Sequence, residues 1–356
     1  MRDFTYETPA TRVVFGAGCA GRALAAEVER LGAGRLLIVA TPRTAALAAA
    51  LAEGLNVVAV FDGVREHVPV ETVDRAVELA ERSGADAVLS VGGGSTTGTA
   101  KAVALRTSLP VVAVPTTYAG SEVTPVWGTT EGARKTTGRS SLVVPKAVLY
   151  DPALTMALPA RLTAVSAMNA MAHCVEAFYA PGANPITDLV AAEGVRVIAG
   201  ALPAVVAGPG DEAGRAGLLY GAYLAGSAFA AAGSGLHHKI CHVLGGAFGL
   251  PHAETHTVLL PHVAAFNEPA VPALRTRAAP ALGDVNVADG LTRLIARIGA
   301  PVSLAGIGLA RSDLDLAVKL VLDKDLRDNP RPVGEPEVRR ILTGALHGRL
   351  PVSTAT

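Results

Sequence analysis

Histidines are concentrated in one short stretch of the chain. Six of the nine histidines fall within residues 237–262, and another, His173, follows Asn169 by four residues. Residues i and i+4 share one face of a helix, so Asn169 and His173 can point at one centre, and so can His238 and His242. An isolated buried histidine is usually a packed core residue, but six in such a short stretch is not a core pattern. The cluster therefore indicates acid–base chemistry or metal binding.

Asn169 occupies the position at which a metal site built on His173, His238 and His252 would carry an acid. A carboxylate supplies much of the attraction for a dication, so a neutral amide in its place lowers the affinity by orders of magnitude. Three imidazoles alone can still hold zinc, and a weakly bound metal stays open as an alternative. We expect that the protein requires no metal.

The composition is that of a globular protein with a large core. Hydrophobic residues make up 50% and charged residues 17% of the 356, and the formal net charge is zero. A zero net charge without a basic block argues against nucleic acid and anionic membranes as partners. The three cysteines have no CxxC spacing, which fits a reducing compartment. The first residues are polar and no apolar run reaches the roughly 20 residues that a bilayer requires, so we expect a cytoplasmic protein.

Short apolar runs alternate with helical stretches over the first 155 residues, which is the pattern of a parallel α/β sheet. We expect strands over residues 35–40, 57–61, 87–91, 111–114 and 147–150, with helices such as 43–55 and 70–83 between them. From residue 159 onward the chain is rich in alanine and leucine, which predicts an all-helical second half. We therefore expect a dinucleotide-binding α/β domain over residues 1–155 and an all-α substrate and catalytic domain over residues 156–356.

Two glycine-rich segments compete for a nucleotide. Residues 16–21 spell GxGxxG after a short apolar run, but no acid stands about 20 residues further on, so a plain turn into a helix is favoured. Residues 90–101, SVGGGSTTGTAK, follow an apolar strand and lead into a helix that we expect over 99–105. Three glycines let the backbone close on an anion, and helix amides favour negative charge. By itself this segment fits an anion site and a glycine-rich joint equally well.

A cluster of hydroxyls follows the next strand, in residues 114–124, VPTTYAGSEVT. Hydroxyl and amide donors suit phosphate or ribose oxygens, although a surface loop of turn formers has the same composition. Loops that follow neighbouring parallel strands meet at the carboxyl edge of the sheet, where ligands bind. Together the two segments favour a bound nucleotide.

These motifs resemble those of the iron-containing alcohol dehydrogenase superfamily. The resemblance is carried by GGGSTTGTAK, PTTYAGSEVT, the Asn169/His173 pair and GLHHKICHVLGGAFGLPHAETH, with TEGARKTTG (130–138), NPITDL (184–189) and NPRPV (329–333) extending it along nearly the whole chain. Metal-dependent members have an acid at Gly98, a PTTAGTGSEVT loop one residue longer, and Asp in place of Asn169. The departures at these three points are those of the maleylacetate reductases within the superfamily.

The resemblance implies an α/β nucleotide-binding domain followed by a helical domain, assembled as a homodimer, with NADH or NADPH as cofactor. It implies reduction of the carbon–carbon double bond of maleylacetate, a small dicarboxylate, to 3-oxoadipate in the degradation of aromatic compounds. The matching motifs imply that the pyrophosphate of the cofactor binds at Gly93, Gly94 and Ser95. They imply that four further residues line the cofactor: Thr116, Thr117, Tyr118 and Ser121. Lys135 would lie near the ribose.

Reduction of an enone flanked by carboxylates needs a hydride at one alkene carbon, stabilisation of an enolate, and a proton at the other carbon. Histidines suit the last two tasks because imidazole titrates near neutral pH, and a partly protonated cluster would also attract a dianion. The resemblance places His242 beside the nicotinamide, so we expect it to donate the proton. His238 and His252 would contact oxyanion or carboxylate groups and His173 would assist. The remaining histidines of the cluster are expected to pack or cap: His237, His256 and His262.

Arg134, Lys135 and Arg139 are candidates for contacts to substrate carboxylates or the cofactor, although an exposed salt-bridged loop explains them nearly as well. Thr41 follows the strand over 35–40, where NAD-selective dehydrogenases often carry an acid for the ribose 2′-hydroxyl, and Arg43 could attract a 2′-phosphate. We therefore expect use of both NADH and NADPH. Two alternatives stay open: a related reductase acting on another unsaturated oxo-acid, and a non-redox homologue that uses the fold for lyase or binding chemistry.

Overall fold

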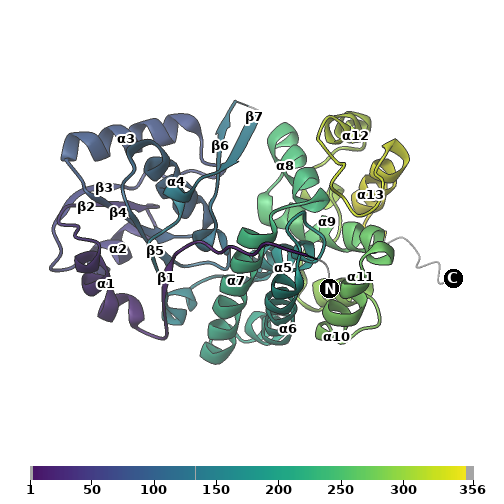
Figure 1. Ribbon diagram of the computed structural model, residues 1–356, viewed down its shortest axis with the longest axis horizontal. Helices are drawn as coiled ribbons and strands as arrows, with labels where there is room; N and C mark the ends of the chain where they lie inside the picture. The colour runs from purple at the N-terminus through teal and green to yellow at the C-terminus, as the bar shows by residue number, and fades with distance from the viewer. Residues whose placement is uncertain (1–2, 133, 350–356) are drawn as a thin grey trace. The chain divides into compact units, whose positions relative to one another are not determined.

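The structure is a computed structural model that describes residues 3–132 and 134–349 (Figure 1). The chain divides into two compact units, one spanning Thr8–Leu158 and one that contains the chain from Pro159 onward. The first is an α/β unit with a parallel sheet and the second is helical, so the predicted fold class is confirmed. The assignment of the nucleotide to the first unit and of the substrate to the second stays a prediction.

A six-stranded parallel sheet forms the centre of the first unit, in the order β1-β8-β5-β4-β2-β3. Its strands are β1 Arg12–Phe15, β2 Leu36–Ala40, β3 Val57–Phe61, β4 Ala87–Gly92, β5 Val111–Pro115 and β8 Ala147–Tyr150. Strands β2, β4, β5 and β8 are buried along their whole length, and they are therefore continuous apolar runs in the sequence. All five predicted strands are confirmed, and β1 adds an edge strand that the sequence pattern did not indicate.

Helices cover both faces of this sheet. They are α1 Cys19–Arg30, α2 Ala45–Leu51, α3 Val70–Ser83 and α4 Gly94–Thr107. Alternate residues of β2 face two cores: Leu36 and Ile38 pack with α1 and α2, whereas Leu37 and Val39 pack with α3 and α4. Helix α3 has the predicted bounds, but α2 is shorter than the expected 43–55 and α4 begins well before the expected residue 99.

A two-stranded antiparallel hairpin is the second sheet of this unit. It pairs β6 Val126–Glu131 with β7 Arg134–Arg139, and the sequence analysis did not predict it. Lys135 lies opposite Thr130 in this pairing, and Arg139 lies opposite Val126. The side chain of Arg134 is outside the described part of the chain, so its candidate role stays a prediction.

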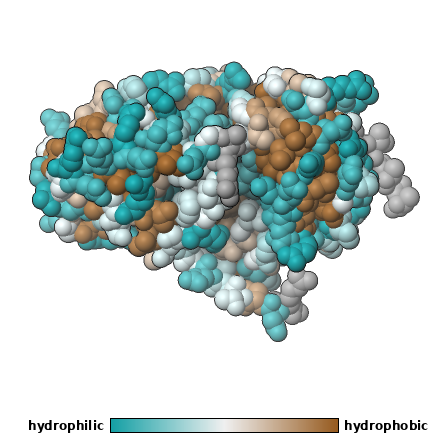
Figure 2. Space-filling model, turned by 90° about the horizontal axis from the view of Figure 1, so that it is seen from above, coloured by the Kyte–Doolittle hydropathy of each residue, from teal (hydrophilic) through white to brown (hydrophobic). Residues whose placement is uncertain are grey.

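The described elements of regular secondary structure in the second unit are all helices, which confirms the expectation for this half. Its helices are α5 Ala160–Ala177, α6 Pro185–Ala207, α7 Glu212–Ala232, α8 Leu236–Phe248, α9 His252–Asn267, α10 Ala279–Ala281, α11 Val287–Arg297, α12 Leu314–Leu322 and α13 Glu335–His347. Helix α5 is buried over most of its length and packs against α6, α7 and α9. Helices α8, α9, α12 and α13 share one hydrophobic core. On the face drawn in Figure 2, hydrophilic residues lie among the hydrophobic ones.

Helix α6 is, among the described helices, the one that is long and apolar enough by itself to cross a membrane, with a mean hydropathy of 1.8. Helices α7 and α8 pass the same test only as a pair, and the chain bends by 103° between them. Asp188, Glu193 and Arg196 interrupt this helix, so it is not a continuous apolar run of the length that a bilayer requires. A core helix of a soluble protein can be equally long and apolar, and α6 packs against α5 and α7.

Candidate functional site

The start of α4 forms the first part of the candidate nucleotide site. Gly93 is the N-cap, and among the described residues no side chain caps this helix or places an acid in its first turn. The first-turn amides have no partner within the helix, so they can bind an anion. A Cβ on Gly93 would lie 2.8 Å from Thr117 Cγ2, and glycine therefore allows this close approach. The expected start at residue 99 is too late because the glycines carry the N-cap and the first turn of the helix.

The hydroxyl-rich loop after β5 lies against this helix start. The backbone N–H of Thr116 donates to Gly92 O at 2.9 Å and ties the ends of β4 and β5 together. Thr116 and Thr117 are partly exposed, whereas Tyr118 is fully buried. Ser121 Oγ is buried and makes no hydrogen bond within the described part of the chain. A buried hydroxyl without a hydrogen bond to the protein is suited to bind a polar atom of a ligand.

Thr41 lies at the same carboxyl edge, because it follows β2 and β2 is the neighbour of β4. Its hydroxyl lies 3.0 Å from Thr44 Oγ1. The structure thus brings Thr41, the α4 start and the loop after β5 to one edge of the sheet, while Lys135 lies on the separate hairpin. The contacts of these residues with a cofactor stay a prediction.

The GxGxxG segment is occupied by a carboxylate of the chain itself. The backbone N–H groups of Gly18 and Ala20, at the start of α1, donate to Asp151 Oδ1 and Oδ2 at 2.9 and 3.2 Å. A carboxylate bound at the N-terminus of a helix neutralises its partial positive charge, so that end attracts a second anion less strongly. The geometry therefore supports the interpretation of a plain turn into a helix.

A buried lysine beneath the hydroxyl-rich loop was missed by the sequence analysis. Lys101 Nζ donates to the backbone oxygens of Ser121 and Thr124, at 2.9 and 2.8 Å, and so fixes the end of this loop to α4. Burial lowers the pKa of Lys101 to about 7. Burial also raises the pKa of Glu122, which accepts a hydrogen bond from the hydroxyl of Tyr150 at 2.7 Å. The position of Lys101 at the end of GGGSTTGTAK was the available signal.

Gly98, the position of the acid in the GGGSxxDxAK pattern, is covered by Val68. A Cβ on Gly98 would lie 2.8 Å from Val68 Cγ2. Val68 has a φ of 52°, in the left-handed region that β-branched residues avoid. Its carbonyl accepts from Thr130 N at 3.0 Å, and the carbonyl of His67 accepts from Thr130 Oγ1 at 2.8 Å. The hairpin thus holds the strained residue Val68 against Gly98, the position of the acid in the GGGSxxDxAK pattern.

The histidines of the second unit gather from three helices. Helix α5 carries Asn169 and His173, α8 carries His238 and His242, and α9 begins with His252. The rings of His173 and His238 stack with centroids 5.1 Å apart, and the next distances along the cluster are 6.0 Å for His238–His242 and 6.5 Å for His242–His252. The predicted catalytic histidines therefore form one connected cluster. Asn169 is buried one turn before His173 on α5.

His256 lies inside this cluster, although we expected it to pack or cap. Its ring centroid is 4.4 Å from that of His252 and 4.7 Å from that of His238. His252 and His256 are four residues apart on α9, so helical spacing could have indicated this position. His262, in contrast, lies against Gly344 of α13, where a Cβ would come within 3.0 Å of its Nδ1.

Glu176 is the acid of this cluster, and the sequence analysis did not select it. It lies on α5, three residues after His173, and its carboxylate contacts Nδ1 of His238 through Oε2. Its Oε1 accepts a hydrogen bond from the backbone N–H of His238 at 3.3 Å. The i,i+3 spacing from His173 was the signal that could have identified it.

Burial governs the charge of three histidines of the cluster. It holds the pKa of His173 and His256 well below the usual value and lowers that of His237 to about 3. These three imidazoles are neutral near pH 7, so the expectation of a partly protonated cluster does not apply to them. For Glu176, burial raises the pKa, but the neighbouring His238 outweighs this and brings it to about 2. The carboxylate of Glu176 is therefore charged.

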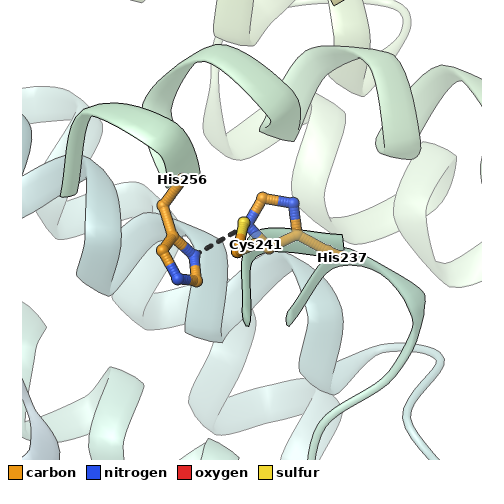
Figure 3. Close-up of side chains that lie close together, drawn as sticks. All are labelled: His237, Cys241 and His256. Atoms are coloured by element: carbon orange, nitrogen blue, oxygen red, sulfur yellow. Dashed lines mark hydrogen bonds between the residues drawn. The ribbon is translucent and has the colours of Figure 1, made fainter. Parts of the chain in front are cut away.

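The histidine and cysteine side chains of the cluster include possible metal ligands. Among the described residues, one group of three His, Cys, Asp or Glu ligand atoms lies within 4.8 Å, and it is His237, Cys241 and His256 (Figure 3). His237 Nε2 and His256 Nδ1 are hydrogen-bonded at 2.9 Å, whereas two nitrogens on one tetrahedral zinc are about 3.3 Å apart. This trio is thus a hydrogen-bonded contact between α8 and α9. The ligand atoms of His173, His238 and His252 do not all lie within 4.8 Å of one another, so these residues do not fit a preformed metal site.

Several ring nitrogens of the cluster are buried without a hydrogen bond inside the described chain: Nδ1 of His173, Nδ1 of His237, Nε2 of His238 and Nε2 of His256. An unsatisfied buried polar group costs about 1–3 kcal/mol, so several together are rare in a core that serves only packing. They indicate a site that a polar ligand completes.

Family models match both units of the chain. The model for iron-containing alcohol dehydrogenase matches residues 10–152, and the C-terminal model of the same family matches residues 163–346.

The chain is also similar to known proteins over its whole length. It is 45% identical over 353 residues to a maleylacetate reductase of Burkholderia cepacia, covering 99% of this chain and 100% of that protein. The crystal structure of maleylacetate reductase from Rhizobium sp. strain MTP-10005 has 46% identity and a TM-score of 0.92, covering 99% and 100% of the two chains. A putative alcohol dehydrogenase from Ralstonia eutropha JMP134 has 48% identity and a TM-score of 0.94 with the same coverage.

Proposed function

Because the chain belongs to the iron-containing alcohol dehydrogenase family, we propose that this NAD(P)H-dependent oxidoreductase reduces the carbon–carbon double bond of maleylacetate to give 3-oxoadipate. One observation carries the proposal: a chain 45% identical to a maleylacetate reductase has a histidine cluster in which an amide, Asn169, stands where an acidic metal ligand would be. A homodimer, which the resemblance implies, and a cytoplasmic location, which the composition of the sequence favours, are part of the same proposal.

The residues at the carboxyl edge of the sheet fit a dinucleotide. First-turn amides of α4 suit the pyrophosphate, and the hydroxyls of Thr116, Thr117 and Ser121 suit phosphate or ribose oxygens. When bound, NADH or NADPH supplies the hydride. Thr41 has no charge to repel a 2′-phosphate, which supports use of both cofactors.

The histidine cluster suits the remaining steps. As the hydride adds to the alkene carbon remote from the ketone, the electron pair moves to the ketone oxygen, and the carbon next to the ketone then takes a proton. His252 and His238 would contact the developing oxyanion or the carboxylates, and His173 would support them. His242 is the least buried of the three histidines on α8 and would donate the proton.

We propose that this reaction needs no metal. An amide stands at residue 169, and the ligand atoms of His173, His238 and His252 do not all lie within 4.8 Å of one another. The enolate needs a hydrogen-bond or proton donor, which an imidazole can supply without a Lewis acid.

The decisive test is turnover of maleylacetate, followed as loss of reduced-cofactor absorbance, with 3-oxoadipate identified by mass spectrometry. We expect oxidation of NADH and NADPH in a one-to-one ratio with the product formed. A folded protein that binds cofactor but does not turn over maleylacetate would instead favour another unsaturated oxo-acid as substrate.

A further inference from the structure

Glu176 makes two different contacts with its two carboxylate oxygens. It is fully buried on α5, and its carboxylate lies at the start of α8. Oε1 faces the backbone of α8: the N–H of His238 donates to it at 3.3 Å, and a Cβ on Gly235 would lie only 3.2 Å away. Oε2 faces the imidazole of His238 and contacts its Nδ1.

This arrangement determines which nitrogen of His238 carries a proton. An ionised carboxylate can only accept hydrogen bonds, so the Nδ1 that contacts it must be the N–H nitrogen. The other nitrogen, Nε2, is buried and has no hydrogen bond to any described residue. It belongs to a ring that stacks on His173 at 5.1 Å and lies 4.7 Å from His256, within the cluster described above.

We propose that Glu176 is a positioning residue that holds His238 in the Nδ1–H form and leaves Nε2 as the one ring nitrogen that meets the substrate. The catalytic meaning of this inference rests on the proposed function, but the tautomer itself does not. A carboxylate that holds a catalytic imidazole in this way in serine proteases contributes about 10⁴-fold in rate, and its amide variant loses that contribution by reversing the tautomer.

A purely structural role for Glu176 would be to cap α8, and a glutamine variant separates the two roles. The backbone N–H of His238 requires an acceptor at the Oε1 position, so the amide oxygen of Glu176→Gln is held on that side. The amide NH₂ then faces Nδ1 of His238. Because NH₂ is a donor, Nδ1 becomes the acceptor and the proton of a neutral ring moves to Nε2. The variant thus keeps the cap and changes the tautomer.

The experiment uses ¹⁵N-histidine-labelled full-length protein, with the His238 signals assigned by their loss in His238→Gln. Long-range ¹H–¹⁵N spectra are expected to show His238 protonated at Nδ1 in the wild type and at Nε2 in Glu176→Gln. With maleylacetate, kcat of Glu176→Gln should fall about 10²–10⁴-fold while KM changes less than about threefold. The melting temperature should stay close to that of the wild type.

Glu268→Gln is the matched control, because Glu268 is also buried in the second unit and accepts a backbone N–H, from Val287 at 3.3 Å. It should leave the His238 spectrum and kcat unchanged. Wild-type His238 protonated at Nε2, or a Glu176→Gln variant that reverses the tautomer but keeps its kcat, overturns the inference. Absence of maleylacetate turnover in the wild type contradicts the proposed function alone, since the spectra test the tautomer without substrate.

Discussion

Gly93 and Thr117 lie in direct contact at the carboxyl edge of the sheet. A Cβ at residue 93 would be 2.8 Å from Thr117 Cγ2 and 3.1 Å from Thr117 Oγ1. The first residue is the N-cap of α4 and the second belongs to the loop after β5, so one contact sets the distance between the two segments that we propose bind the nucleotide. Any added atom must displace the threonine.

Gly93→Ala is therefore expected to raise the Kd for NADH by about tenfold or more, since the new methyl group separates the two segments. The change is measured by fluorescence titration of NADH. Gly21→Ala is the matched control, because a Cβ there has nothing within 4 Å and residue 21 lies in α1, at the end of the GxGxxG segment. Weaker NADH binding in Gly21→Ala, with Gly93→Ala unchanged, would move the nucleotide site to the GxGxxG segment.

The strands of the first unit were predictable because burial on both faces leaves a continuous apolar run. Strands β2, β4 and β5 have this pattern, and each was identified. Strand β1 has only four residues, with exposed ends and a half-buried middle, so its pattern is too weak to separate it from a turn. The start of α4 was missed because Gly93 and Gly94 indicate a loop by propensity, whereas in the fold Gly93 packs closely against Thr117 and Gly94 faces Ala119.

The parts of the candidate site that lie within one helix were predictable from helical spacing. The positions of Asn169 with His173 and of His238 with His242 follow from the i,i+4 rule within one helix. The i,i+3 spacing from His173 marks Glu176, but no local pattern indicates its contact with His238, which joins two helices across 62 residues of sequence. Neutral imidazoles follow from burial, which depends on the packing of α5, α8 and α9 and not on residue type alone.

The purified protein is expected to contain well under one equivalent of iron, zinc or manganese, measured by plasma mass spectrometry. Chelator treatment should leave the rate of maleylacetate reduction nearly unchanged. Asn169→Asp should raise metal affinity, because it returns a charged ligand to the helix face of His173. It should not raise the rate, since a dication would suppress protonation of the histidines. Stoichiometric metal, with activity lost on chelation and restored on adding the metal back, contradicts the metal-free reaction.

Acid should destabilise the protein in part through His262. Burial lowers the pKa of this histidine from 6.5 to about 4, so between these values the unfolded chain binds a proton that the folded chain does not. The free energy of unfolding therefore falls as the pH drops from about 6.5 to about 4. His262→Asn should reduce this loss by on the order of 2–3 kcal/mol, measured by urea unfolding across the pH range. The exposed His347 gives the control His347→Asn, which should keep the wild-type pH dependence.

His242→Ala should reduce kcat for maleylacetate by about 10²–10⁴-fold if this imidazole donates the proton. The Kd for NADH should change much less than kcat, because the pyrophosphate and ribose contacts are expected from the first unit and not from α8. His262→Asn serves as a control, since His262 lies against α13. A His242→Ala variant with wild-type kcat would assign the proton transfer to another group.

Thr41 is expected to permit both cofactors, because it lies at the end of β2 without a charge. Thr41→Asp should lower kcat/KM for NADPH at least about tenfold relative to NADH, since a carboxylate repels the 2′-phosphate and accepts from the ribose 2′-hydroxyl. Thr41→Ser keeps a neutral hydroxyl within reach of Thr44 Oγ1 and should leave the ratio unchanged. A wild-type preference for NADH beyond about a hundredfold, or about 2.7 kcal/mol, would show that residues other than Thr41 select the cofactor.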